Sequence, residues 1–86
     1  MSEVVLYGQP GCHLCEEAEA ALDELRRSHA FGLVKIDIHS DPEIARRFLF
    51  EIPVIEVDGA RVTSAPIDIR AVAAALTASA TDAGGA

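Results

Sequence analysis

The chain has 86 residues, of which 50% are hydrophobic, and its formal net charge is −7. This is enough apolar material for the core of one small domain without stabilising disulfides or a structural metal. No segment of the sequence has the pattern of a secretory signal or a membrane span. The acidic balance argues against nucleic acid and anionic membranes as partners, because both are bound by concentrated basic faces, so we expect a soluble cytoplasmic protein.

The first half of the chain predicts a strand, a helix and a second strand. The strand covers residues 3 to 8, where the apolar run from Val4 to Tyr7 is typical of a central strand covered on both faces. After the turn at Gln9-Pro10-Gly11, helical spacing places on one face Leu14, Ala18, Ala21, Leu22 and Leu25. Alternation from Leu33 to Ile38 then predicts a strand near the rim of the sheet.

A short helix and a hairpin are expected next. Ser40-Asp41-Pro42-Glu43 combines the spacing of a capping box with a proline suited to the first helical turn. Ile52 to Val57 predicts a strand, and Asp58-Gly59 can take the positive φ angles of a tight turn. The strand around Arg61 to Thr63 should therefore run antiparallel to it.

The last expected element is a helix that starts near Ser64 and Pro66. Its apolar positions recur at helical spacing and are Ile69, Val72, Ala73, Leu76 and Ala80. The small residues that follow predict a flexible tail over 81–86, which leaves one domain over 1–80.

The order β-α-β-α-β-β-α predicts an α/β fold of the thioredoxin type, with a four-stranded mixed sheet flanked by three helices. Three motifs, Pro10-Gly11-Cys12-His13-Leu14-Cys15, Ile52-Pro53-Val54 and Asp58-Gly59, together resemble the small glutaredoxin-like family over roughly residues 3 to 78. The resemblance implies a thioredoxin-like (glutaredoxin-like) fold, thiol-disulfide oxidoreductase activity and a cis peptide bond before Pro53 that faces the cysteines. Without this resemblance, a trans Ile52–Pro53 bond would be expected, because trans is the commoner isomer.

Cys12 and Cys15 are the candidate catalytic residues. Cys12 lies where the first loop turns into the helix, so unpaired N–H groups and the helix dipole favour its thiolate, and it should be the nucleophile. Cys15, one turn deeper, should resolve the mixed disulfide. The nearby Glu16 and Glu17 should oppose ionisation of Cys12. We expect no bound cofactor and no metal, so an external thiol or an NADPH-linked reductant must reduce the pair again.

His13, Ile52 and Pro53 are the candidate substrate-binding residues. His13 is expected to be an exposed spacer rather than an acid or base. The resemblance further implies that the main chain of Ile52 pairs with an extended substrate segment. The expected partners are a disulfide-containing protein or small molecule and a reductase or low-molecular-weight thiol, with the chain itself a monomer.

The residues that bind glutathione in glutaredoxins are replaced here. Those proteins typically carry a lysine three residues before the first cysteine, a threonine two before the cis-proline, and Gly-Gly-x-Asp after the hairpin. This chain has Gln9, Glu51 and Thr63-Ser64-Ala65-Pro66 at these places. Glu51 should repel a peptide carboxylate and Gln9 supplies no compensating charge, so we expect a weak response to glutathione.

Three other charged residues could contact such a ligand, and each also has a simpler interpretation. Asp68 could meet an ammonium group, or could stabilise the start of the last helix. Arg46 or Arg47 could reach a carboxylate, or could be ordinary solvated charges on a helix.

Two alternatives to an oxidoreductase stay open. One is a metal or iron-sulfur site that uses Cys12 and Cys15, with His13 as a further ligand. A closed zinc site wants four ligands, and no second C-x-x-C exists, so such a site would have to be shared across a dimer. The other is a redox-inert binding module, because thioredoxin-like folds carry several functions.

Overall fold

The computed structural model describes the backbone of residues 2–85 and the side chains of residues 2–78. The elements are β1 (Ser2–Gly8), α1 (His13–Leu25), β2 (Phe31–Asp37), a short 3-10 helix η1 (Ile38–Ser40), α2 (Pro42–Phe48), β3 (Val54–Val57), β4 (Ala60–Ser64) and α3 (Ile69–Gly85). Apart from η1, this is the predicted order. Within the described part of the chain, no helix combines the length and apolarity that crossing a membrane requires.

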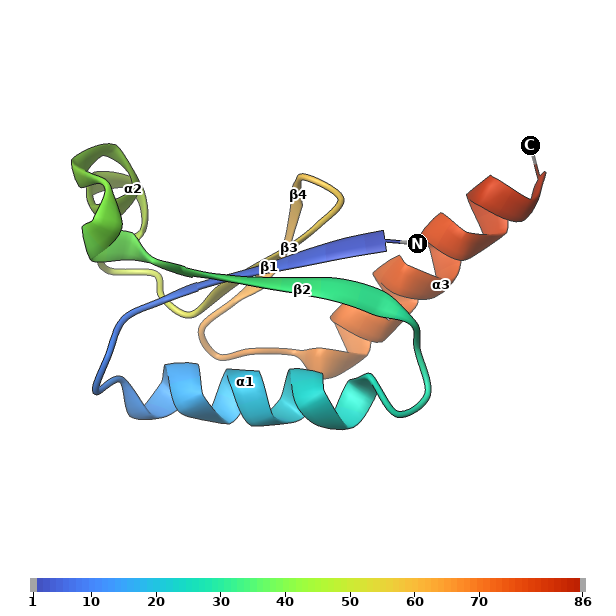
Figure 1. Cartoon of the computed structure of the whole chain (residues 1–86), viewed down its shortest axis with the longest axis horizontal. Helices are drawn as coiled ribbons and strands as arrows, with labels where there is room; N and C mark the ends of the chain where they lie inside the picture. Colours follow the sequence, from blue (N-terminus) through green and yellow to red (C-terminus); the bar gives the residue numbers. More distant parts are fainter. Residues whose placement is uncertain (1, 86) are drawn as a thin grey trace.

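The four strands form one mixed sheet in the order β2-β1-β3-β4 (Figure 1). β1 pairs in parallel with β2 along its whole length, from Ser2 opposite Phe31 to Gly8 opposite Asp37. β3 runs antiparallel to both β1 and β4. The predictions of a central first strand, a second strand at the rim and a C-terminal antiparallel hairpin are therefore confirmed.

The main core lies between the sheet and two helices, α1 and α3 (Figure 1). Its buried members alternate along the strands and recur at helical spacing along the helices: Val4, Leu6, Ala18, Leu22, Phe31, Ile55, Val57, Val72 and Leu76. A smaller core consists of Ile38, Phe48 and Val54, with Tyr7, Ile44 and Ile52 packed against it. This second cluster attaches η1 and α2 to the end of the sheet where β1 leads into the cysteine loop.

The hairpin between β3 and β4 turns at Asp58 and Gly59, which both have positive φ angles, of 50° and 87°. This confirms the predicted turn. Asp58 also fixes the hairpin to β1, because its backbone N–H donates to the Glu3 carbonyl and its carboxylate accepts from the Glu3 N–H, both at 2.9 Å.

The helix starts differ from the prediction. At α2 the capping residue is Asp41, not Ser40: the Asp41 carboxylate accepts from the backbone N–H of Glu43 at 2.9 Å, and Pro42 opens the helix. The Ser40 hydroxyl instead donates to the Asp37 carbonyl and closes η1. A short carboxylate directly before the proline reaches the free N–H groups, so it replaces the expected capping box.

The last helix begins later than expected. β4 continues through Ser64, and α3 starts only at Ile69, where the Asp68 carboxylate accepts from the Arg70 N–H at 3.0 Å. The backbone of α3 is described as far as Gly85. The side chains of Ala80 and of the range 81–86 lie outside the described residues, so the division of the chain at residue 80 stays a prediction.

Candidate redox site

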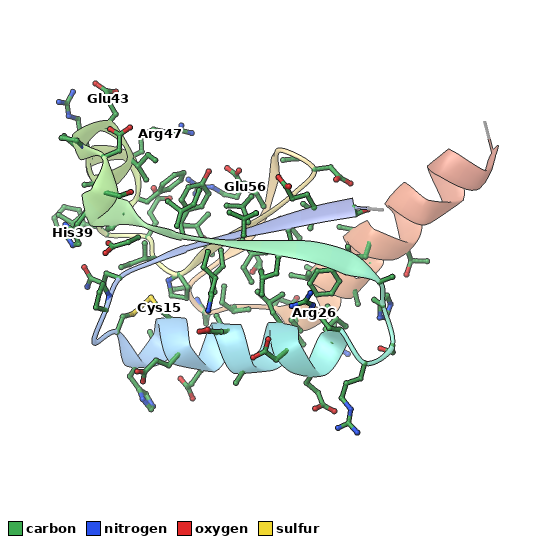
Figure 2. All side chains as sticks on the ribbon, in the orientation of Figure 1. Cys15, Arg26, His39, Glu43, Arg47 and Glu56 are labelled. Carbon is green, nitrogen blue, oxygen red and sulfur yellow. A yellow bond between two sulfur atoms is a disulfide. The ribbon has the colours of Figure 1, made fainter. Side chains whose placement is uncertain are left out.

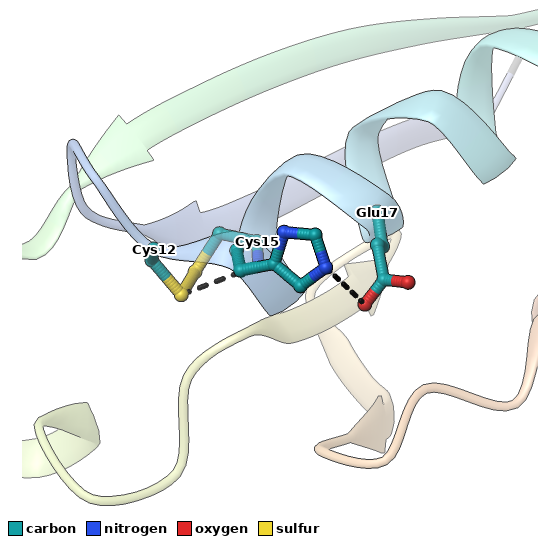
Figure 3. Close-up of polar contacts among 4 residues, drawn as sticks. Cys12, Cys15 and Glu17 are labelled. Carbon is teal, nitrogen blue, oxygen red and sulfur yellow. Dashed lines mark hydrogen bonds and ion pairs between the residues drawn. A yellow bond between two sulfur atoms is a disulfide. The ribbon is translucent and has the colours of Figure 1, made fainter.

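Cys12 and Cys15 form a disulfide at the start of α1, with their Cα atoms 5.2 Å apart (Figure 3). Cys12 is the N-cap residue, with an extended backbone at φ −93° and ψ 111°. Its sulfur accepts a hydrogen bond from the backbone N–H of Cys15 across 3.2 Å. One of the N–H groups that every helix start leaves unpaired is thereby directed at Cys12 Sγ, which favours a negative charge on that atom.

The two sulfur-bearing residues differ in burial. Cys12 is half-buried at the tip of the loop, whereas Cys15 is 7% exposed and packs under β1. A disulfide-bearing substrate can therefore approach Cys12 more readily than Cys15. The roles of attacking and resolving cysteine stay predictions.

His13, the first residue of α1, has an exposed side chain. Its side chain is 84% exposed, and its Nε2 lies 3.8 Å from the carboxylate of Glu17, one helical turn on (Figure 3). This placement is that of an exposed spacer between the cysteines. A contact between His13 and a substrate stays a prediction.

Pro53 lies beside the cysteine loop, and the Ile52–Pro53 bond is cis, as the resemblance implied. The Ala65–Pro66 bond is cis as well, which no sequence signal had indicated. Both prolines line a groove of about 320 Å³ that also borders Leu14, between the cysteines, and Glu17. The groove thus connects the C-x-x-C turn to Pro53 and to the loop before α3.

Leu14 lies on the same side of α1 as Ala18 and Ala21, as helical spacing predicts, but it does not belong to the core. Its side chain is 52% exposed and lines the groove. The neighbours opposite this first turn of α1, Pro53 and Pro66, leave the groove open, whereas Ala18 and Leu22 further along the helix meet the sheet. Periodicity identifies the face of a helix but not what lies opposite each turn of it.

The main chain of Ile52 is already partly engaged within the fold. Its N–H donates to the Phe48 carbonyl at 3.1 Å, which continues the end of α2, and its side chain packs in the smaller core. A substrate segment that pairs with Ile52 therefore has to use the carbonyl or displace this bond. Strand pairing at Ile52 stays a prediction.

Glu51 forms an ion pair that the sequence did not reveal. Its carboxylate accepts from the guanidinium of Arg61 on β4, and this hydrogen bond holds the pKa of Glu51 below its usual value. The Arg61 guanidinium also lies over the Phe48 ring, 5.2 Å from its centre. Arg61 therefore offsets much of the repulsion expected between Glu51 and a peptide carboxylate, a pairing that depends on the hairpin and has no local sequence signal.

Gln9, in the loop before Cys12, is bonded to His39. The Gln9 side-chain oxygen and His39 Nε2 are 2.7 Å apart. Figure 2 shows His39 at the same end of the molecule as Cys15. η1, which was not predicted, brings this histidine to the cysteine loop.

The other proposed glutathione contacts have local partners. Asp68 caps α3, and the exposed guanidinium of Arg46 lies 3.9 Å from the Glu43 carboxylate on α2. Arg47 lies over the Phe48 ring, 4.9 Å from its centre. Among the described residues there is also no group of three or more His, Cys, Asp or Glu side chains that could hold a metal ion.

A family model described as the glutaredoxin-like domain (DUF836) matches residues 3–77. The chain belongs to this glutaredoxin-like family. The matched range contains both cysteines, Pro53 and the hairpin turn, which are the motifs on which the resemblance rested.

Solved structures confirm the thioredoxin-like fold. Protein Ne2328 from Nitrosomonas europaea is 30% identical, with a TM-score of 0.78 over 87% of this chain and 91% of that one. Protein XcR50 from X. campestris is 29% identical, with a TM-score of 0.69 over 87% and 96% of the two chains. A mutant thioredoxin from Halobacterium salinarum, at 17% identity, shares the fold with a TM-score of 0.67 over 90% and 73%. No curated protein sequence matches this glutaredoxin-like chain.

Proposed function

We propose that this glutaredoxin-like protein is a dithiol-disulfide oxidoreductase that acts on protein or low-molecular-weight disulfides. The observation that carries the proposal is the Cys12–Cys15 disulfide at the start of α1, whose outer sulfur accepts the Cys15 N–H. Structural disulfides usually close long loops, whereas this one spans three residues at a helix end. A disulfide of this kind can be reduced and formed again with little change in the fold.

The cycle starts from the reduced pair. The Cys12 thiolate attacks one sulfur of the substrate disulfide, that S–S bond breaks, and the leaving thiolate takes a proton from solvent. The Cys15 thiol then gives its proton to solvent and attacks the Cys12 sulfur, which releases the second substrate thiolate. Two electrons have moved to the substrate, and Cys12–Cys15 is oxidised.

A second reductant must return the pair to the dithiol. We place the protein in a reducing compartment, the cytoplasm, with an external thiol or an NADPH-linked reductase as electron donor. Glu16 and Glu17, both exposed on the first turns of α1, bring negative charge near Cys12. They should keep the thiol less acidic than one in a basic environment.

Serine substitutions of the two cysteines test the cycle. Cys12→Ser should abolish reduction of a model disulfide, because no nucleophile remains. Cys15→Ser should still attack but should accumulate a mixed disulfide, visible as a mass increase that dithiothreitol removes. Equal turnover by wild type and Cys12→Ser would overturn the proposal, as would stoichiometric metal in protein purified without oxygen.

Two coupled assays identify the reductant. One supplies glutathione with glutathione reductase, the other thioredoxin reductase, each with NADPH. We expect a weak response to glutathione, because neither Gln9 nor Glu51 offers a positive charge to a peptide carboxylate, and the guanidinium of Arg61, which offsets the charge of Glu51, is already hydrogen-bonded to it. A strong response would contradict this interpretation of the two positions and leave the dithiol chemistry intact.

A further inference from the structure

The groove that borders Leu14, the residue between His13 and Cys15, has a composition that points to its ligand. Its walls are mainly apolar side chains, including Leu14 on α1, Pro53, and Pro66 and Ile67 before α3. Glu17 is the one charged residue among those that line it, and no lysine or arginine does. The groove therefore suits an apolar group next to a positive charge.

Leu14, which lines the groove, is one of the exposed apolar side chains of the described residues. Among the described residues, the large hydrophobic side chains with high exposure are Leu14 at 52%, Leu49 at 42%, Phe50 at 97% and Val34 at 40%. Leu14 lies between the cysteines, and Leu49 and Phe50 lie in the segment that leads into Pro53. Of these four, Leu14 lines the groove, and an exposed apolar side chain there offers a contact for an apolar group of a polypeptide.

The charges around the groove select against an anionic ligand. The Glu17 side chain is 60% exposed, its nearest partner is the ring of His13 at 3.8 Å, and the whole chain carries a net charge of −7. Glutathione carries two carboxylates and one ammonium group at neutral pH, so it is repelled by Glu17 and finds few apolar contacts to compensate. A lysine or arginine is attracted instead.

We propose that the groove takes an extended polypeptide segment with an apolar side chain next to its disulfide cysteine and a lysine or arginine opposite Glu17. This rests on the proposed function and names its substrate class: a protein disulfide in an apolar, basic segment. Leu14 and the prolines contact the apolar side chain, and Glu17 selects the basic one.

The charge preference is tested with two capped tripeptides, Leu-Cys-Lys and Leu-Cys-Glu, each supplied as its symmetric disulfide to the fully reduced protein. Wild type should reduce the lysine peptide about twofold to fivefold faster, the range of an exposed ion pair. Glu17→Lys should reverse the preference. The ratio of the two rates cancels any change in Cys12 reactivity, because both peptides meet the same thiolate.

Glu24→Lys is the matched control for charge. Glu24 lies on the same helix, its side chain is 74% exposed, and it is not among the residues that line the groove. Glu24→Lys changes the net charge by the same amount as Glu17→Lys, but it should keep the wild-type preference for the lysine peptide. An equal shift in both variants would show a long-range effect of net charge and would overturn the role of Glu17.

The apolar preference is tested by replacing leucine with serine in the lysine peptide. Wild type should favour the leucine peptide by about fivefold or more, and Leu14→Ser should remove most of this preference. Val34→Ser, on the edge strand β2 and of similar exposure, should keep it. Equal ratios in wild type and Leu14→Ser would overturn the apolar contact.

Hydroxyethyl disulfide, small and neutral, separates this inference from the proposed function. If Cys12 is needed for its reduction but the peptides show no preference, the docking proposal fails and the oxidoreductase stands. If none of the disulfides reacts in a Cys12-dependent way, both proposals fail.

Discussion

Gly8 packs directly against Cys15. A Cβ atom at residue 8 would lie 3.1 Å from both the Cβ and the Sγ of Cys15, closer than side chains normally approach. Gly8 is the last residue of the central strand β1, and Cys15 is in the first turn of α1. The position of the buried cysteine therefore depends on the absence of a side chain at Gly8 on the adjacent strand.

Gly8→Ala should disturb Cys15 without opening the rest of the core. The added methyl should lower the free energy of unfolding by about 1–3 kcal/mol, as overpacking usually does, and should slow the resolving step because Cys15 is displaced. Urea unfolding and the lifetime of the mixed disulfide measure the two effects. Gly32→Ala on β2, where nothing lies within 4 Å of the new Cβ, is the control. It should change neither the free energy of unfolding nor the lifetime of the mixed disulfide.

Phe48 and Phe50 are two residues apart but should respond differently to replacement by alanine. Phe48 is 1% exposed, and its ring lies 4.6 Å from that of Tyr7, so Phe48→Ala should cost about 3–5 kcal/mol of unfolding free energy. Phe50 is 97% exposed, so Phe50→Ala should change the free energy of unfolding by less than about 0.5 kcal/mol. Equal losses in thermal or urea unfolding would contradict this assignment of the smaller core.

Tyr7 should ionise at higher pH than a free tyrosine. Burial raises the pKa of its phenol, and so does the negative charge of Glu56, whose carboxylate accepts from the hydroxyl at 3.2 Å. The chain has one tyrosine and no tryptophan, so the near-ultraviolet absorbance of tyrosinate reports this group alone. Glu56→Gln should lower the midpoint in the folded protein but not in urea; an unchanged midpoint would contradict the assigned cause.

The direction of this shift sets a dependence of stability on pH. A phenol whose pKa is higher in the folded than in the unfolded chain stabilises the fold while it is protonated. The contribution is full below about pH 10, the value for an unfolded tyrosine, and is lost as pH rises through the folded-state pKa. The difference in free energy of unfolding between wild type and Tyr7→Phe should therefore decrease in alkaline solution.

Local signals in the sequence determined most of the architecture. The doubly apolar run of β1, the helical spacing in α1 and the Asp58-Gly59 turn each act over a few residues, so element order, the central strand and the hairpin followed from them. The C-x-x-C spacing at a strand-to-helix turn likewise located the disulfide.

Tertiary structure decided what faces these elements. Two hydrogen bonds join different segments of the fold: Glu51 pairs with Arg61, and Gln9 pairs with His39. The exposure of Leu14 likewise depends on which residues lie opposite it in the folded chain. Such contacts depend on how the loops before Pro53 and α3 meet the first turn of α1, and no periodicity or local motif encodes that meeting. The position of the cysteine pair could therefore be predicted from the sequence, whereas the groove beside Leu14 and Pro53 forms only once the chain has folded.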